Sequence, residues 1–145
     1  MFEKIISHEV IASVIVGFLV CQLIKIITRS AEEKKLALHV FFETGGMPST
    51  HAAFVSSLAL SIGFVEGFFS SVFLVALGLA LIVIRDAMGV RRTVDNVIHS
   101  LNTIIQEKKL KIEHIKVIAG HTPVQVISGI IISCAAVLVM HFFVF

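Results

Sequence analysis

Four long apolar runs constrain the fold of this chain more than any other feature. Each holds at most one Lys, Arg, Asp or Glu, and hydrophobic residues make up 57% of the sequence. A run of about 20 apolar residues spans the bilayer core as a helix, and the runs here are 14–23 residues long. We therefore predict an all-α integral membrane bundle of about four transmembrane helices, in a single domain over 1–145. The runs are Val10–Ile27, Ala52–Val65, Phe68–Ile84 and Pro123–Phe145.

The remaining composition excludes several classes of protein. The first run lacks a basic start and a small-residue cleavage site, so we expect it to stay as a span. A net charge of +2 is too small to indicate a nucleic-acid partner. Cys21 and Cys134 lie inside apolar runs without metal-site spacing, which indicates packing roles. The lipid bilayer is the expected environment, and a homo-oligomer is compatible with it.

A polar turn separates the first apolar run from the second. Gly45 and Gly46 lack side chains, so backbone can lie close to a ligand, and Pro48 suits the first turn of a helix. A helix is expected to begin near Ser49, and its first N–H groups suit an anion such as phosphate. The plainer interpretation is an ordinary capped helix. The stretch reads Thr44-Gly45-Gly46-Met47-Pro48-Ser49-Thr50-His51.

Polar residues at the ends of the four runs are expected to meet on one membrane face. The chain returns to the same side at the end of the first and third runs and at the start of the second and fourth. Connectors on that side carry nearly all Lys and Arg. The positive-inside rule therefore predicts a cytoplasmic polar cluster, with both termini outside. Its members are Lys25, His51, Arg85, Asp86 and His121.

A further helix is predicted after the third run, beginning at Thr93 as N-cap. Its apolar residues recur at helical spacing, and polar residues occupy the other side. Such an amphipathic helix is expected to lie on the membrane surface. The apolar positions are Val94, Val97, Ile98, Leu101, Ile104 and Ile105.

Four ordered motifs resemble those of the divergent PAP2 family, relatives of the type 2 phosphatidic acid phosphatases. The resemblance covers nearly the whole chain. The wider superfamily has a Lys-led motif, a P-S-G-H motif and an S-R-x5-H-x3-D motif. The similar stretches here are Gln22-Leu23-Ile24-Lys25, Gly45-Gly46-Met47-Pro48-Ser49-Thr50-His51, Asp86-Ala87-Met88-Gly89-Val90-Arg91-Arg92 and Gly120-His121-Thr122-Pro123-Val124-Gln125-Val126.

The resemblance implies metal-independent dephosphorylation through a phosphohistidine, without a cofactor. His121 would be the nucleophile, and His51 would protonate the leaving oxygen and then activate water. Imidazole suits both tasks because its ordinary pKa of about 6.5 lies near working pH. Asp86 and Gln125 would assist the nucleophile. The groups expected to bind the substrate phosphate are Lys25, Gly45, Gly46, Ser49, Thr50, Arg91 and Arg92.

Three positions depart from the superfamily pattern. Thr50 replaces a glycine, Ile115 stands where an arginine precedes the nucleophile, and Gln125 replaces the aspartate that orients it. A glutamine can accept a ring N–H but does not stabilise an imidazolium as a carboxylate does. The expected replacements are Asp86 for the carboxylate and Arg91 or Arg92 for the guanidinium.

The expected substrate is a membrane lipid phosphate or pyrophosphate, with phosphatidate-like, phosphatidylglycerophosphate-like and polyprenyl compounds all open. The alternative is a noncatalytic phosphate- or lipid-binding membrane module, or a transport subunit. The departures from the superfamily pattern favour that alternative. Release of phosphate distinguishes the two.

Overall fold

The computed structural model describes residues 2–41, 45–110, 112–115 and 120–145, leaving aside the side chains of residues 2–7, 91 and 92. Helices make up 80% of the described residues, which form no strand. The prediction of an all-α membrane protein is confirmed. In chain order the elements are α1 (Phe2–Glu33), η1 (Leu38–Phe41), α2 (Thr50–Glu66), α3 (Ser71–Met88), α4 (Val90–Glu107) and α5 (Pro123–Phe143).

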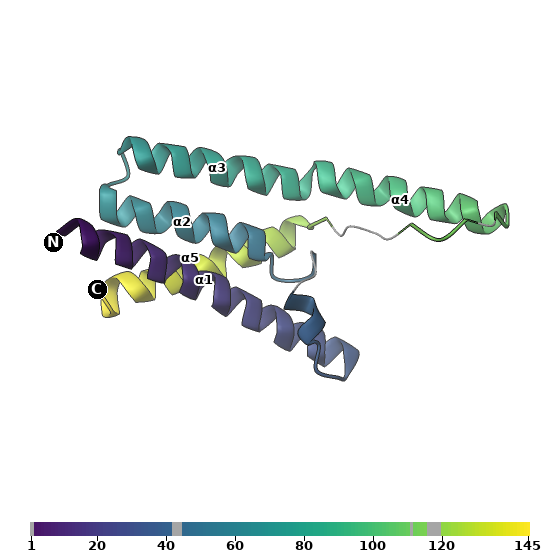
Figure 1. Cartoon of the computed structure of the whole chain (residues 1–145), viewed down its shortest axis with the longest axis horizontal. Coiled ribbons are helices and arrows are strands. Elements are labelled where there is room, and N and C mark those ends of the chain that lie inside the picture. Colours follow the sequence, from purple (N-terminus) through teal and green to yellow (C-terminus); the bar gives the residue numbers. More distant parts are fainter. Residues whose placement is uncertain (1, 42–44, 111, 116–119) are drawn as a thin grey trace.

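Helices α1, α2, α3 and α5 form a bundle in which α2 contacts the other three (Figure 1). Within the described part of the chain, three helical stretches are long and apolar enough to cross a membrane: His8–Glu33, Ser71–Glu107 and Pro123–Phe143. Helix α2 is a shorter apolar helix of 17 residues. At 1.5 Å per residue it is about 25 Å long, close to the thickness of the hydrocarbon core.

Small residues allow α2 to occupy the centre of the bundle. Ser57 and Ser61 are buried, and their hydroxyls donate to the carbonyls of Ala53 and Ser57, each at 2.7 Å. Their polar atoms are thus paired within α2 itself. A Cβ atom at Gly17 of α1 would lie 3.0 Å from the Cβ atom of Ser57. Close approach of backbones through small residues is typical of helices packed in a membrane.

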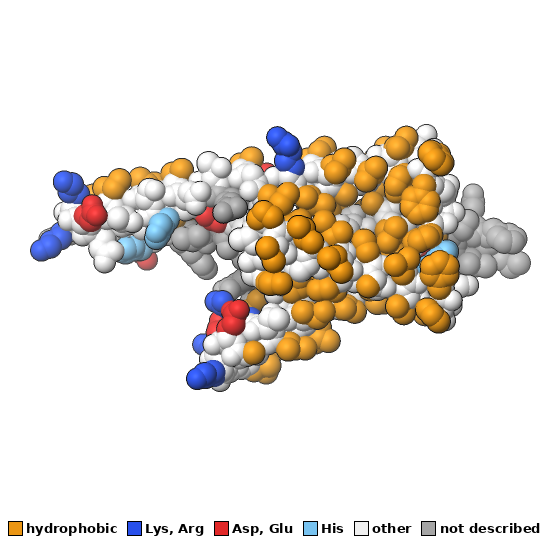
Figure 2. Space-filling view, turned by 180° about the vertical axis from the view of Figure 1, so that it is seen from behind, with side chains coloured by type: hydrophobic (Ala, Val, Ile, Leu, Met, Phe, Trp, Pro, Cys, Tyr) orange, Lys and Arg blue, Asp and Glu red, His pale blue; other side chains and the backbone are white. Residues whose placement is uncertain are grey.

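The outer surface of the bundle is apolar. Figure 2 shows hydrophobic side chains spread over the bundle, while Lys, Arg, Asp and Glu gather mainly on the two parts that project from it. Large side chains such as Val75, Leu81 and Ile131 are more than half exposed. Contiguous apolar exposure on this scale fits contact with lipid and not with water.

Both termini lie at one end of the bundle (Figure 1). There the Nδ1 atom of His141 lies 2.7 Å from the carboxylate of Glu9, and its ring stacks on Phe64 with centroids 4.3 Å apart. These contacts join α1, α2 and α5. The predicted polar residues lie toward the opposite end, as the alternation of spans requires.

Several helix ends differ from the ends of the predicted apolar runs, among them the start of α1, at Phe2 where the run begins at Val10. Helix α1 continues past Ile27 to Glu33 because Arg29 pairs with Glu33 at 2.8 Å, one turn away. Helix α3 begins at Ser71, three residues after the predicted Phe68, because the Ser70 hydroxyl caps it by accepting the N–H of Phe73. The latter two corrections come from side-chain contacts that hydropathy does not record.

Helix α4 also differs from its prediction. It begins at Val90, so Thr93 lies within the first turn and is not the N-cap; its hydroxyl donates to the carbonyl of Gly89. Helix α4 follows α3 nearly in line and projects beyond the bundle (Figure 1). Ile98 and Ile105 are buried, while Leu101 and the rest of the apolar stripe are exposed. Its place on a membrane surface stays a prediction.

Candidate functional site

The beginning of α2 is built around a fully buried serine. Ser49 is the N-cap, and its hydroxyl accepts the N–H of Ala52 at 3.3 Å. The predicted helix start is therefore confirmed. Pro48 precedes the cap and does not form the first turn of the helix, which corrects the prediction for that residue. This use of the Ser49 hydroxyl is what the plainer interpretation of the turn, an ordinary capped helix, predicts.

The backbone before the cap has a left-handed conformation at two positions, and both are occupied by glycine. Gly45 has φ of 89° and Gly46 has φ of 80°, values that L side chains rarely adopt. Thr28 of α1 holds the turn in place, because its hydroxyl donates to the carbonyl of Met47 at 3.0 Å. Thr44, where the polar stretch was predicted to start, lies outside the described residues.

Lys25 lies under this turn. Its side chain is only 2% exposed, and its Cε atom would lie 3.2 Å from a Cβ atom at Gly46. The missing side chain of Gly46 therefore makes room for the end of Lys25. A lysine buried on α1 beside a glycine turn supplies positive charge where the sequence predicts phosphate.

Replacing Lys25 by methionine is expected to weaken the binding of orthovanadate, a phosphate analogue, by about 10–100-fold. Methionine keeps the apolar stem and removes the charge, so folding is expected to persist. Lys35→Met is the matched control, since the Lys35 side chain is 71% exposed beside Glu33. Titration calorimetry of both variants measures the difference. Equal affinities would show that Lys25 does not bind the anion.

The start of α2 is docked directly on α5. The backbone N–H of Ser49 donates to the carbonyl of Gln125 at 2.9 Å, and the Cys21 thiol of α1 lies 3.7 Å from the Ser49 carbonyl. A Cβ atom at Gly129 would overlap that carbonyl oxygen and lie 3.3 Å from the Ser49 nitrogen. Three helices therefore meet at one residue, and glycine is the only residue at 129 that fits this contact.

Gln125 has a role that the motif comparison did not anticipate. Its side-chain oxygen accepts the N–H of Thr122 at 2.9 Å, while the Thr122 hydroxyl accepts the N–H of Gln125 at 3.4 Å. This reciprocal pair is a capping box at the start of α5. Pro123 occupies the first turn, as predicted. The amide oxygen of Gln125 thus serves the helix start.

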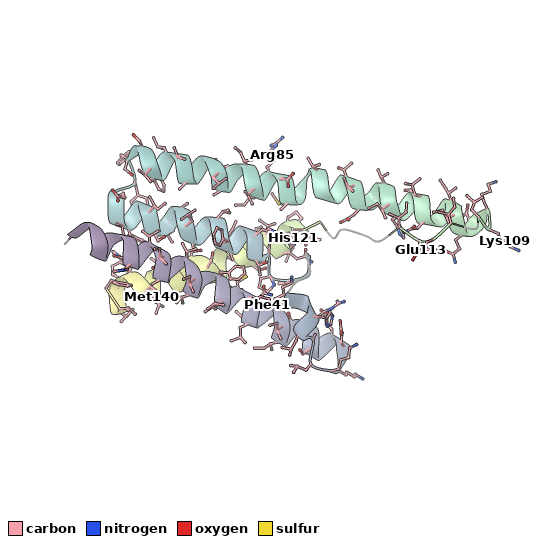
Figure 3. The ribbon with its side chains drawn as sticks, viewed as in Figure 1. Phe41, Arg85, Lys109, Glu113, His121 and Met140 are labelled. Carbon is pink, nitrogen blue, oxygen red and sulfur yellow. The ribbon has the colours of Figure 1, made fainter. Side chains whose placement is uncertain are left out.

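His121 immediately precedes this cap and is 2% exposed. Its backbone N–H donates to the carbonyl of Ala87 in the last turn of α3, at 3.0 Å. Figure 3 shows His121 where α5 begins, with Arg85 pointing away from the bundle on α3. Arg85 therefore does not join the cluster, whereas Asp86, next to Ala87, is half-buried at the same end of α3.

The structure brings the two motif histidines together. The ring centroids of His51, in the first turn of α2, and His121 are 5.9 Å apart, with the planes tilted by 58°. Both rings can therefore reach one phosphoryl group, whose phosphorus must come to about 3–3.5 Å from an attacking nitrogen. Thr50 is the first residue of α2 and is half-buried beside His51.

Two predicted phosphate ligands are placed only by their backbone. Arg91 and Arg92 belong to the first turn of α4, and their side chains lie outside the described part of the structure. In the described part, no group of three or more His, Cys, Asp and Glu could hold a metal ion. The predicted site residues whose side chains are described offer the imidazoles of His51 and His121, the amine of Lys25 and the carboxylate of Asp86.

Asp95 is a residue that the motifs did not single out. Its carboxylate accepts the backbone N–H of Gly120, the residue before His121. In the sequence Asp95 appears only as one polar residue on the outer side of an amphipathic helix. Nothing in the helical spacing distinguishes it, because its partner is 25 residues away along the chain.

The chain is similar to a described protein family and to a bacterial membrane protein. A family model described as the divergent PAP2 family matches residues 6–136. The chain is also 27% identical over 155 residues to "Uncharacterized membrane protein YuiD" of Bacillus subtilis (strain 168), with 97% of this chain and 98% of the relative covered. No solved structure matches the chain.

Proposed function

The chain belongs to the divergent PAP2 family, and we propose that it is a membrane-embedded, metal-independent phosphatase acting on a lipid phosphate or pyrophosphate. One observation carries this proposal. His51 and His121 come from different motifs and different helices, yet their rings lie 5.9 Å apart. A nucleophile and a general acid must both reach one phosphoryl group, and this pair has that spacing.

The first step transfers the phosphoryl group to the protein. A lone pair on a ring nitrogen of neutral His121 forms a bond to phosphorus, and the bond from phosphorus to the leaving oxygen breaks. Protonated His51 gives its proton to that oxygen, so the lipid leaves as an alcohol or, from a pyrophosphate, as a monophosphate. The buried charge of Lys25 stabilises the nonbridging oxygens, which carry most of the negative charge.

The second step restores the protein. His51, now neutral, takes a proton from water, and the water oxygen bonds to phosphorus as the bond to His121 breaks. Inorganic phosphate leaves, and both imidazoles return to their starting protonation states. Thr50, Gly45, Gly46 and the hydroxyl proton of Ser49 are proposed to donate to the phosphate, with Arg91 or Arg92 supplying a guanidinium.

The site lies at an end of the bundle, at the level where a lipid headgroup meets water. We place this end in the cytoplasm by the distribution of Lys and Arg in its connectors. Both termini would then lie outside, which a reporter enzyme fused after Phe145 checks directly. Asp86 is proposed to support the imidazolium of His121, in place of the aspartate that Gln125 replaces.

A noncatalytic phosphate- or lipid-binding module is the second candidate, and the capping box supports it. Because the Gln125 oxygen binds Thr122, the third motif lacks the carboxylate pairing on which superfamily catalysis depends. A protein of this kind would bind orthovanadate or a lipid phosphate saturably and release no phosphate. A transport subunit would behave in the same way.

The deciding experiment measures phosphate release by the detergent-purified protein in excess chelator. The panel comprises phosphatidate, phosphatidylglycerophosphate and undecaprenyl pyrophosphate in mixed micelles. We expect chelator-resistant release from at least one of them, with saturation kinetics. Binding of all three without release would overturn the enzyme and favour the noncatalytic module. Activity that needs added divalent metal would overturn the two-histidine mechanism.

A further inference from the structure

Helix α4 holds the chain that leads to His121. The side chain of Asn102 makes two hydrogen bonds to the backbone of Ile115, donating to its carbonyl and accepting its N–H, both at 2.8 Å. Asp95 accepts the N–H of Gly120. The returning chain is therefore fastened to α4 at two points before it reaches the nucleophile.

The two fastening residues lie on one side of α4. They are seven positions apart, which is about two helical turns, so their side chains project in nearly the same direction. The chain bonded to Asn102 and then to Asp95 runs antiparallel to the helix. Figure 1 shows the described part of this return, residues 112–115, beside the far part of α4. The helix thus acts as a template that sets where residue 120 lies.

Asp95 is not an ordinary solvated acid. The residue is half-buried, one carboxylate oxygen accepts the Gly120 N–H, and the other, Oδ1, is buried and accepts no hydrogen bond from the described residues. Burying a carboxylate oxygen without a donor costs free energy, as would leaving the Gly120 N–H unmatched. An amphipathic helix that only needed solubility would place this carboxylate in water.

His121 is held on both sides by such contacts. Before it, Asp95 binds Gly120; at its own N–H, the carbonyl of Ala87 accepts; after it, the capping box fixes the start of α5. Of these three restraints, only the one at Asp95 comes from outside the bundle. The side chain on α4 therefore restrains Gly120, the residue directly before His121.

We propose that Asp95 is a positioning residue for His121, acting through Gly120, with Asn102 as its helper. The expected effect of Asp95 on kcat rests on the proposed phosphatase function. Its expected effect on the position of the His121 ring does not. Helix α4 then belongs to the active site, although it projects from the bundle. A displacement of a nucleophile by about 1 Å costs roughly 100-fold in rate.

The test compares Asp95→Ala, which removes the acceptor, with Asp95→Asn, which keeps a side-chain oxygen in its place. Asn96→Ala is the matched control, since Asn96 is the exposed neighbour on the same helix. With dioleoyl phosphatidate as the probe, Asp95→Ala is expected to lower kcat by about 10–100-fold while KM changes by less than about 3-fold. Asp95→Asn is expected to recover most of kcat, and the control to match the parent.

A second readout needs no activity. Diethyl pyrocarbonate modifies accessible neutral imidazoles, and His121 is 2% exposed while His99 is exposed on α4. Mass spectrometry of the modified peptides is expected to show His121 labelled roughly 10-fold faster in Asp95→Ala than in the parent. The reason is that loss of the bond to Gly120 makes local opening around the buried ring more frequent. His99 serves as the internal reference, and Asn102→Ala is expected to give a smaller change in the same direction.

The outcomes separate the two proposals. If the parent hydrolyses no lipid but His121 labelling depends on Asp95, the positioning role stands and the phosphatase falls. If all variants label His121 at the parental rate, or if Asp95→Asn is as impaired as Asp95→Ala, the positioning role through this hydrogen bond is overturned. Should Asp95→Ala not fold, the same comparison between Asn102→Ala and the parent decides.

Discussion

Replacing His121 by alanine is expected to reduce phosphate release by about 10³-fold or more, because the proposed reaction then has no nucleophile. The folded state is expected to persist, since the backbone bond from residue 121 to Ala87 does not use the ring. The measurement is single-turnover phosphate release from radiolabelled phosphatidate. A phosphorylated protein stable in base and labile in acid is expected in the parent and absent in the variant.

The matching replacement of His51 separates the two roles. Loss of a general acid is expected to cost about 10²–10⁴-fold with a lipid alkoxide as leaving group. With para-nitrophenyl phosphate, whose leaving group needs no proton, the first step is expected to be much less impaired. A phosphorylated intermediate should then accumulate, because His51 is also required to activate water.

An exposed histidine provides the control for both variants. His99 is exposed on α4, and His99→Ala is expected to retain parental turnover. Parental turnover by His121→Ala would remove the two-histidine mechanism altogether. Equal loss in all three variants would point to unfolding, which circular dichroism in the same detergent would reveal.

Replacing Gly129 by alanine is expected to destabilise the protein by about 1–3 kcal/mol and to reduce activity with it. The added Cβ would overlap the carbonyl oxygen of Ser49 and lie 3.2 Å from its carbon. Backbone atoms cannot move aside as a flexible side chain does. The start of α2 must therefore shift away from α5, and this shift separates the two histidine rings.

Gly78→Ala is the matched control for this experiment. It is also a helical glycine, in α3, and nothing lies within 4 Å of an added Cβ. Alanine has the higher helix propensity by up to about 1 kcal/mol, so the control is expected to be neutral or slightly stabilised. Denaturant unfolding in mixed micelles compares the two. Equal stability of both variants would contradict the contact between α5 and Ser49.

The motif residues were only partly predictable in their roles. The pattern around Pro48 and Pro123 correctly indicates two helix starts, and Ser49 is confirmed as a cap, while the structure adds Thr122 as the cap of α5. A capping hydroxyl binds an N–H only two or three residues further along the chain, so the local sequence is sufficient to indicate it. Gln125 could not be assigned in this way, because its side chain binds its own helix start while its carbonyl binds Ser49 across the bundle.

Charged residues were the least predictable part of the fold. Arg29 lies beyond the first apolar run of the sequence, yet it belongs to α1 and pairs there with Glu32 and Glu33. Asp95 reads as one polar residue among several, yet it binds the chain next to His121. In each case the decisive partner is a specific side chain or backbone group. Average hydropathy records only that a residue is polar and not which group it binds.

The sequence alone determined that this chain is a helical membrane protein of the divergent PAP2 family, where its second and fourth spans begin, and that its motif histidines belong to one end of the bundle. Those properties depend on the length of apolar runs and on residues adjacent in the chain. The tertiary structure alone decided which polar groups touch, at Ser49 and Gln125, at Gly129, and at Asp95 and Gly120. These contacts join residues far apart in sequence, and they form only when packed helices bring their backbones together.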